Sequence, residues 1–232
     1  MFDTVKYNQW MQSSRVLQVR YISLLTATLY YIYAQIDTFL VPAKSLFFVH
    51  SIHLYFLCPA ILVIIGLTFF EKYHAILTYF LILIPIGASL GNFLILSKFE
   101  ESTLYTPETY FIIFWVFILS GLRLFLAIIS VSVIIFISFF SNAYLSPQAF
   151  ILHLFWILCS TSFGILGAYL LERSNKKVFK NKEILATLAI TDKLTGLYNR
   201  AKFDEVLSQE LARAKRSHHT FGLVIKKTIP IP

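Results

Sequence analysis

The sequence predicts an all-α polytopic membrane protein with about six transmembrane helices, followed by a linker helix and an incomplete α/β fragment. Its 232 residues are 57% hydrophobic and only 14% charged, whereas soluble domains average roughly 45–50% apolar and about 25% charged residues. Several apolar runs reach the ~20 residues that a helix needs to cross a bilayer core. A water-soluble globule is therefore excluded as the fold class.

Residues 1–20 are predicted to be a cytoplasmic N-terminal segment, and residues 21–171 a membrane input domain. Clear candidate spans are Tyr21–Leu40, Leu54–Phe70, Ala75–Leu96 and Phe150–Leu171. The first span is too long for the apolar part of a signal peptide, and no small-x-small cleavage site follows it. We therefore expect it to be retained.

The apolar stretch Tyr110–Phe140 is open to two interpretations. As one helix it would be about 46 Å long, and Arg123 would lie near its middle at an insertion cost of ~2.5–3.5 kcal/mol. A break at residues 120–123 instead gives two short spans. The break brings the predicted number of spans to six.

Loop charges favour six spans with both termini in the cytoplasm. The inside segments then carry most of the cations before the tail, namely Lys6, Arg15, Arg20, Lys72 and Arg123. The outside loops carry Lys44 and Lys98 beside the acids Glu100, Glu101 and Glu108. Five spans would place the N-terminal cations outside, against the positive-inside rule.

Ionisable residues within spans are functional candidates because their burial is costly. Asp37 lies near the end of the first span, and we interpret it as an interfacial residue facing water. Imidazole and thiolate groups can ligate haem or other metals; the residues of these types are His50, His53, His153, Cys58 and Cys159. No tight ligand spacing supports a metal site, so packing and interhelical hydrogen bonding are the favoured alternative.

Small residues and prolines within the spans affect helix packing. Gly87, Gly91, Gly164 and Gly167 form small-residue seams that permit close helix contact. Pro59 and Pro85 could kink their helices, and paired broken helices mark substrate sites in transporters. Because no inverted repeat is evident, a small membrane transporter is the weaker alternative function.

Residues 172–190 are predicted to be a linker helix that continues the last span from Phe150 to about Ala189. Thirteen of the twenty Lys and Arg residues lie from Arg173 onward, which we attribute to cytoplasmic retention rather than nucleic-acid binding. Leu171, Val178 and Leu185 recur every seven residues. This spacing indicates either a short parallel coiled coil, and hence a homodimer through spans and linker helix, or a solvated amphipathic helix.

A break and a second helix follow the linker helix. Thr191 and Asp192 are capping residue types, and Gly196 favours a turn. Asn199 suits the N-cap of a helix that runs to about Arg216. Residues 221–225 then have the composition of a buried strand.

Residues 192–200 read Asp-Lys-Leu-Thr-Gly-Leu-Tyr-Asn-Arg. This stretch resembles the opening signature of the GGDEF family of bacterial diguanylate cyclases, Asp-x-Leu-Thr-x-Leu-x-Asn-Arg. The similarity covers residues 191–225, which are therefore expected to be the truncated start of a GGDEF-like domain, with 226–232 as a non-matching tail. The matching positions are Asp192, Leu194, Thr195, Leu197, Asn199 and Arg200, and the resemblance implies a structural coupling role for them.

The resemblance also implies a chemistry that this chain is not expected to perform. Intact family members hold GTP with Mg²⁺ and pair to make cyclic di-GMP, using an aspartate after the first strand as metal ligand. Here Lys226 and Lys227 occupy that region, and cations repel Mg²⁺. The GGDEF turn and the guanine-reading residues do not follow. We therefore assign no catalytic, cofactor-binding or metal residue, and expect an inactive chain without cofactors.

The expected function is that of a membrane-embedded sensory and dimerisation module of a diguanylate cyclase, in the bacterial inner membrane. An alternative is a non-catalytic partner that pairs with an intact cyclase. The ending Thr-Ile-Pro-Ile-Pro is compatible with a natural truncation, with a frameshift or with a gene remnant. The expected partners are the lipid bilayer and a second copy, and the sensed ligand is not indicated by any motif.

Overall fold

The computed structural model describes residues 4–98, 102–192, 194–217, 220 and 222. The chain divides into two compact units, Met1–Lys176 and Lys177–Pro232. Regular structure in the described ranges is helical, with one isolated antiparallel bridge between Thr191 and Tyr198. The predicted helical fold class is confirmed. The predicted strand at 221–225 falls almost entirely outside the described residues, so the α/β fragment stays a prediction.

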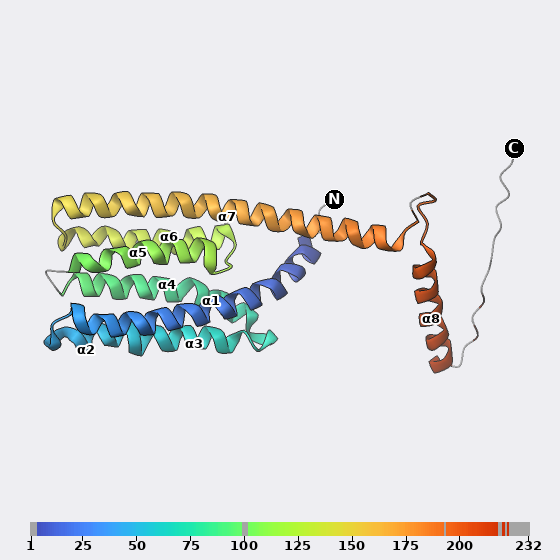
Figure 1. Ribbon diagram of the computed structural model, residues 1–232, viewed down its shortest axis with the longest axis horizontal. Coiled ribbons are helices and arrows are strands. Elements are labelled where there is room, and N and C mark those ends of the chain that lie inside the picture. The colour runs from blue at the N-terminus through green and yellow to red at the C-terminus, as the bar shows by residue number, and fades with distance from the viewer. Residues whose placement is uncertain (1–3, 99–101, 193, 218–219, 221, 223–232) are drawn as a thin grey trace. The chain divides into compact units, whose positions relative to one another are not determined.

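The unit Met1–Lys176 is a bundle of helices that lie side by side (Figure 1). Its long helices are α1 (Thr4–Leu40), α2 (Ala43–Ile52), α3 (Cys58–Leu67), α4 (His74–Leu96), α5 (Thr106–Phe114), α6 (Leu124–Phe139) and the first part of α7 (Pro147–Ile190). Short turns connect or extend them: η1 (His53–Leu57), η2 (Glu71–Tyr73), η3 (Ser102–Tyr105), η4 (Trp115–Leu119) and η5 (Phe140–Ala143). Helix α1 contacts α3, and α4 contacts α3, α5 and α6.

Four helical segments of the described chain are long and apolar enough to cross a membrane: Ala43–Leu67, Glu71–Leu96, Leu124–Ala143 and Pro147–Ile190. Thr103–Leu119 is a shorter apolar helix. Helix α1, which contains the predicted first span Tyr21–Leu40, is not among the four. The multi-helix membrane domain is thus supported, while the number six stays a prediction.

The long apolar stretch after residue 110 does break at residues 120–123. The π-helical turn η4 ends at Leu119 and α6 begins at Leu124. Between them Gly121 has a φ of 68°, a left-handed conformation that favours glycine. Arg123 precedes α6 and donates a hydrogen bond of 2.8 Å to Asn8 Oδ1. The interpretation as one helix is therefore excluded.

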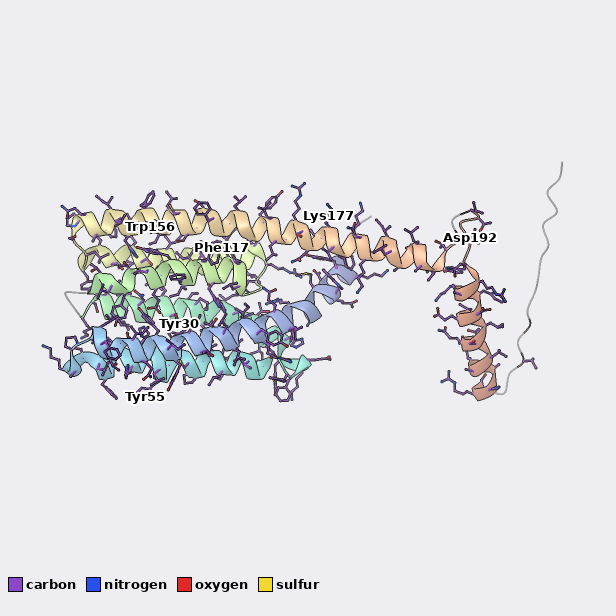
Figure 2. All side chains as sticks on the ribbon, in the orientation of Figure 1. Tyr30, Tyr55, Phe117, Trp156, Lys177 and Asp192 are labelled. Carbon is purple, nitrogen blue, oxygen red and sulfur yellow. The ribbon has the colours of Figure 1, made fainter. Side chains whose placement is uncertain are left out.

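The surface of the bundle is apolar and part of its interior is polar. Large apolar side chains are exposed on several helices, including Phe39, Phe47, Phe111, Phe125 and Ile151. Figure 2 shows Tyr55 at the outer edge of the bundle. Soluble monomers rarely expose such extensive apolar patches. This distribution fits a lipid environment.

Two of the glycines predicted to allow close packing do so between α7 and η4. A Cβ atom on Gly164 would collide with the Phe117 ring, and one on Gly167 would lie 2.5 Å from Ile118 Cδ1. Larger residues would push α7 away from η4. The predicted seam is confirmed at these positions.

Helix α7 continues without interruption from Pro147 to Ile190, a length of about 66 Å for 44 residues. This confirms the predicted helix from residue 150 to about 189. Helix α8 (Arg200–Ser217) follows, within two residues of its predicted bounds, and none of its side chains is buried.

Candidate functional site

A cluster of buried polar side chains, here called the polar cluster, lies inside the bundle between α1, η1, α4, η3 and α5. Its members are Asp37, His53, Asn92, Tyr105 and Glu108, each at most 9% exposed. The prediction that Asp37 faces water is wrong, because its side chain is fully buried. Glu108 was predicted to lie in an outer loop, but it is in the first turn of α5 and turned inward.

The His53 imidazole lies between two carboxylates. Its Nδ1 is 2.7 Å from Asp37 Oδ2, and its Nε2 is 3.5 Å from Glu108 Oε2. Buried charges persist when they are paired and hydrogen-bonded. A protonated imidazole would compensate one of the two negative charges, so the charge of this site depends on the proton that His53 holds.

Neutral side chains donate hydrogen bonds to the two carboxylates of the polar cluster. Tyr105 donates its hydroxyl to Asp37 Oδ1 at 2.7 Å, and Tyr30 donates to Glu108 Oε1 at 2.9 Å. Asn92 Nδ2 donates both to Glu108 Oε2, at 2.9 Å, and to the Tyr105 carbonyl, at 2.8 Å. The hydrogen bonds therefore connect α1, α4 and α5 through one carboxylate.

A π-helical turn contributes His53. In η1 the backbone N–H of Cys58 bonds to the His53 carbonyl, five residues back. Pro59 follows and has no N–H to offer to the preceding turn. Such single π turns occur frequently at functional sites because they change which side of the helix a residue faces. Here η1 coincides with the full burial of His53.

A cavity of about 520 Å³ borders the polar cluster. Its walls are mostly apolar side chains of α1, α3, α4, α5 and η4. The polar members of the lining include Thr26, Tyr30, Tyr33 and Glu108. Ligand pockets are typically about 300–1,000 Å³, largely apolar, with a few polar groups. The cavity therefore suits an apolar ligand that carries a hydrogen-bonding group.

The three candidate histidines do not meet at a common metal site. His50 Nε2 lies 2.8 Å from the Ala34 carbonyl, and His153 Nδ1 lies 2.8 Å from the Tyr110 hydroxyl. Within the described ranges no group of three or more His, Cys, Asp or Glu side chains could hold a metal ion. The favoured alternative, interhelical hydrogen bonding, is confirmed for His50 and His153.

The second candidate region is the signature turn, residues 191–199, which joins α7 to α8. Figure 2 shows Asp192 within it. Asp192 Oδ1 accepts hydrogen bonds from the backbone N–H of Thr195 at 2.9 Å, its hydroxyl at 2.9 Å, and the backbone N–H of Leu194 at 3.0 Å. These donors lower the pKa of the Asp192 carboxyl below its ordinary value. Gly196 has a φ of 69°, which permits the tight reversal.

Asn199 connects both ends of the signature turn. Its Nδ2 donates to the Ala189 carbonyl at 2.8 Å, at the end of α7. Its Oδ1 accepts from the Lys202 backbone N–H at 3.0 Å, which makes it the N-cap of α8. One side chain thus binds the last turn of one helix and the first turn of the next.

The side chains of the remaining signature residues lie outside this hydrogen-bond network, although the backbones of Leu194 and Leu197 belong to it. Leu194 and Leu197 are 95% and 69% exposed. Arg200 is the first residue of α8, with its Nε 3.9 Å from Asp204 Oδ2. The structure therefore brings together Asp192, Thr195 and Asn199 as a structural junction and leaves the two leucines as exposed apolar surface.

The described acids after residue 190 do not fit a Mg²⁺–GTP site. The Asp192 carboxylate already accepts three hydrogen bonds, and Asp204, Glu205 and Glu210 each have a basic neighbour on α8. Lys226 and Lys227 lie outside the described residues.

Comparison with known families gives a match in the C-terminal part of the sequence. Residues 189–228 match the family described as diguanylate cyclase, GGDEF domain. No curated protein matches the sequence significantly. The match begins in the last turn of α7 and includes the signature turn and α8. The chain therefore combines a set of apolar, span-length helices with a GGDEF-like segment.

Proposed function

We propose that this chain is the membrane-embedded sensory and dimerisation module of a diguanylate cyclase-type signalling protein, acting in cyclic di-GMP signalling. One observation carries the proposal: the single helix α7 contains a span-length apolar part and reaches the GGDEF-like segment, which starts at residue 189. Six spans, cytoplasmic termini and an inner-membrane location belong to the same proposal. The apolar exterior of the bundle supports it.

The linker part of α7 offers a surface for dimerisation. Val178 and Leu188 are about half exposed and Leu185 is 66% exposed, and Val178 and Leu185 are seven residues apart. Apolar residues repeated at this spacing form the seam of a parallel coiled coil. A second copy of α7 would cover them and place two GGDEF-like segments side by side.

The polar cluster and its cavity are the proposed input site. Buried ionisable groups within a membrane bundle are functional candidates by default. Because Glu108 accepts hydrogen bonds from α1 and α4 while it belongs to α5, a ligand that competes for this carboxylate would change how three helices pack. The signature turn would pass a displacement of α7 to α8 through Asn199.

Cysteine cross-linking of the full chain in membranes tests dimerisation. In a background with Cys58 and Cys159 replaced by Ala, Leu185→Cys places a thiol on the seam and Lys182→Cys places one off it. We expect disulfide-linked dimers to form several-fold faster for Leu185→Cys. Equal rates for the two variants would count against pairing through α7.

Spin labels at position 185 test the input site. We expect Glu108→Gln to change the distance distribution between labels on two copies, because it weakens the hydrogen bonds that join α1, α4 and α5. Tyr55→Phe, at the exposed outer edge of the bundle, is the control and should leave the distribution unchanged. If the wild type, Glu108→Gln and Tyr55→Phe gave identical distance distributions, the polar cluster would not act on α7 and would not be the input site.

A further inference from the structure

A second cavity, here called the inner cavity, has a volume of about 710 Å³ and lies wholly within the unit Met1–Lys176. Its walls come from the first turns of α1, the start of α4, the break before α6, and the part of α7 around residues 168–176. Its polar lining includes Asn8, Gln12, Arg15, His74, Arg123 and Lys176.

Among the described residues, neither arginine of the inner cavity is paired with a carboxylate. Arg15 Nη2 donates to Thr78 Oγ1 at 3.2 Å, and Arg123 donates to Asn8 Oδ1 at 2.8 Å, so both guanidinium groups have neutral partners. Glu172 is the sole acid among the lining residues, and its carboxylate is 2.6 Å from Lys176 Nζ. Burial and the neighbouring Arg123 lower the pKa of Arg15, although a guanidinium stays charged in proteins.

Two N–H donors beside the inner cavity have no acceptor among the described residues. Arg15 Nε is buried and unpaired. The second donor is His74 Nε2. Gln12 Nε2 lies 3.1 Å from His74 Nδ1, and if Nδ1 accepts this hydrogen bond, the neutral ring carries its proton on Nε2. This Nε2 atom is also buried and unpaired. Because buried polar groups are nearly always hydrogen-bonded, these donors indicate an acceptor supplied from outside the protein.

We propose that the inner cavity binds a phosphate group, held by Arg15 and Arg123. Guanidinium groups match the geometry of phosphate oxygens with paired hydrogen bonds, and one anion would compensate both cations. The phosphate belongs either to an anionic lipid headgroup, which the basic end of the bundle would attract, or to a soluble compound.

A bound phosphate would connect α1 and the break before α6 at the place where α7 leaves the bundle. Ala168, Leu171 and Asn175 of α7 form part of the wall. Occupancy would hold this section of α7 against α1. That regulatory consequence rests on the proposed function, whereas phosphate binding does not.

Binding to the purified full chain in nanodiscs tests the proposal. One arm compares phosphatidylcholine discs with discs that contain phosphatidylglycerol, and measures by native mass spectrometry which lipid stays bound after detergent release. The other arm titrates inorganic phosphate into phosphatidylcholine discs. We expect Arg123→Gln, a change at an exposed side chain, to weaken binding about tenfold, the effect of roughly 1.4 kcal/mol. Lys72→Gln removes one charge outside the cavity lining and should bind like the wild type.

Each outcome decides the proposal. Selective retention of phosphatidylglycerol assigns the site to a lipid headgroup, and saturable binding of inorganic phosphate assigns it to a soluble compound. Circular dichroism confirms that Arg123→Gln keeps its helices, and Arg15→Gln serves as the second variant. Binding of neither ligand by the wild type, or equal loss in Arg123→Gln and Lys72→Gln, overturns the proposal. Neither result would bear on dimerisation through α7.

Discussion

Polar side chains stabilise the polar cluster and the signature turn in opposite ways. In the polar cluster, Asp37 and His53 are fully buried and pair with each other across two elements. In the signature turn, Asp192 and Asn199 are partly exposed and bind nearby backbone groups. A buried charge without its partner is costly, whereas an exposed hydrogen bond contributes little net free energy. The two regions should therefore respond very differently to substitution.

Apolar side chains are exposed in both units, but the bundle also has a buried apolar core. In the bundle they cover the outside, where lipid would surround them. In the described part of the second unit, Leu194, Leu197 and the apolar face of α8 are exposed without a hydrophobic core beneath them. The bundle is therefore stabilised by its interior, and the junction by local hydrogen bonds.

The largest expected effect is at His53. We expect His53→Ala to lower the free energy of unfolding by about 3–5 kcal/mol, because it leaves two buried carboxylates without their shared partner. The control, His50→Ala, removes a single hydrogen bond to a backbone carbonyl and should cost about 1 kcal/mol. Denaturant titration of the purified chain in detergent measures both. Equal losses would mean that the polar cluster carries no paired charge.

Helix packing in the bundle should show the next largest effect. We expect Gly164→Ala to lower the free energy of unfolding by about 1–3 kcal/mol, because the new methyl group would overlap the Phe117 ring. Gly66 on α3 is a matched control with no atom near the added methyl group. Gly66→Ala should be neutral or stabilising by up to about 1 kcal/mol, since alanine favours helix. The same titration measures both, and a neutral Gly164→Ala would contradict the close contact.

In the junction a smaller effect is expected. Asn199→Ala removes the N-cap of α8 and should destabilise that helix by about 1 kcal/mol while the bundle is unchanged. Hydrogen exchange of the full chain would detect faster exchange at the Lys202 amide and its neighbours. Ser208→Ala, at an exposed position inside α8, is the control. If the control has the same effect, the cap is not what stabilises the start of α8.

The smallest effect expected is a pH dependence of the signature turn. The folded-state pKa of Asp192 is lower than the ordinary value of 3.8. The turn therefore gains stability from this carboxylate above the ordinary pKa and loses it as the pH falls through the folded-state pKa. Amide exchange at Leu194 and Thr195, corrected for intrinsic rates, should accelerate on acidification. Asp192→Asn should abolish this dependence, and a dependence that persists would assign it to another group.

Local signals predicted the elements that local chemistry controls. The absence of Pro and Gly between Gly167 and Gly196 predicted the long helix through residue 190, and the capping residue Asn199 predicted the start of α8. The break at residues 120–123 was predicted from Arg123 and from Gly121, which lies two residues before it. Each of these depends on backbone propensity and hydrogen bonds within a few residues, which the sequence displays directly.

The sequence by itself thus determined the helical class, the apolar exterior, the continuous α7 and the GGDEF-like junction. Only the tertiary structure decided that Asp37, His53 and Glu108 meet, although Asn92 inside an apolar run was a signal that a buried partner existed. It also placed Arg15 and Arg123, more than a hundred residues apart, around one cavity. Contacts between distant segments depend on how helices pack and on where π turns and prolines rotate them, and no local pattern encodes that geometry.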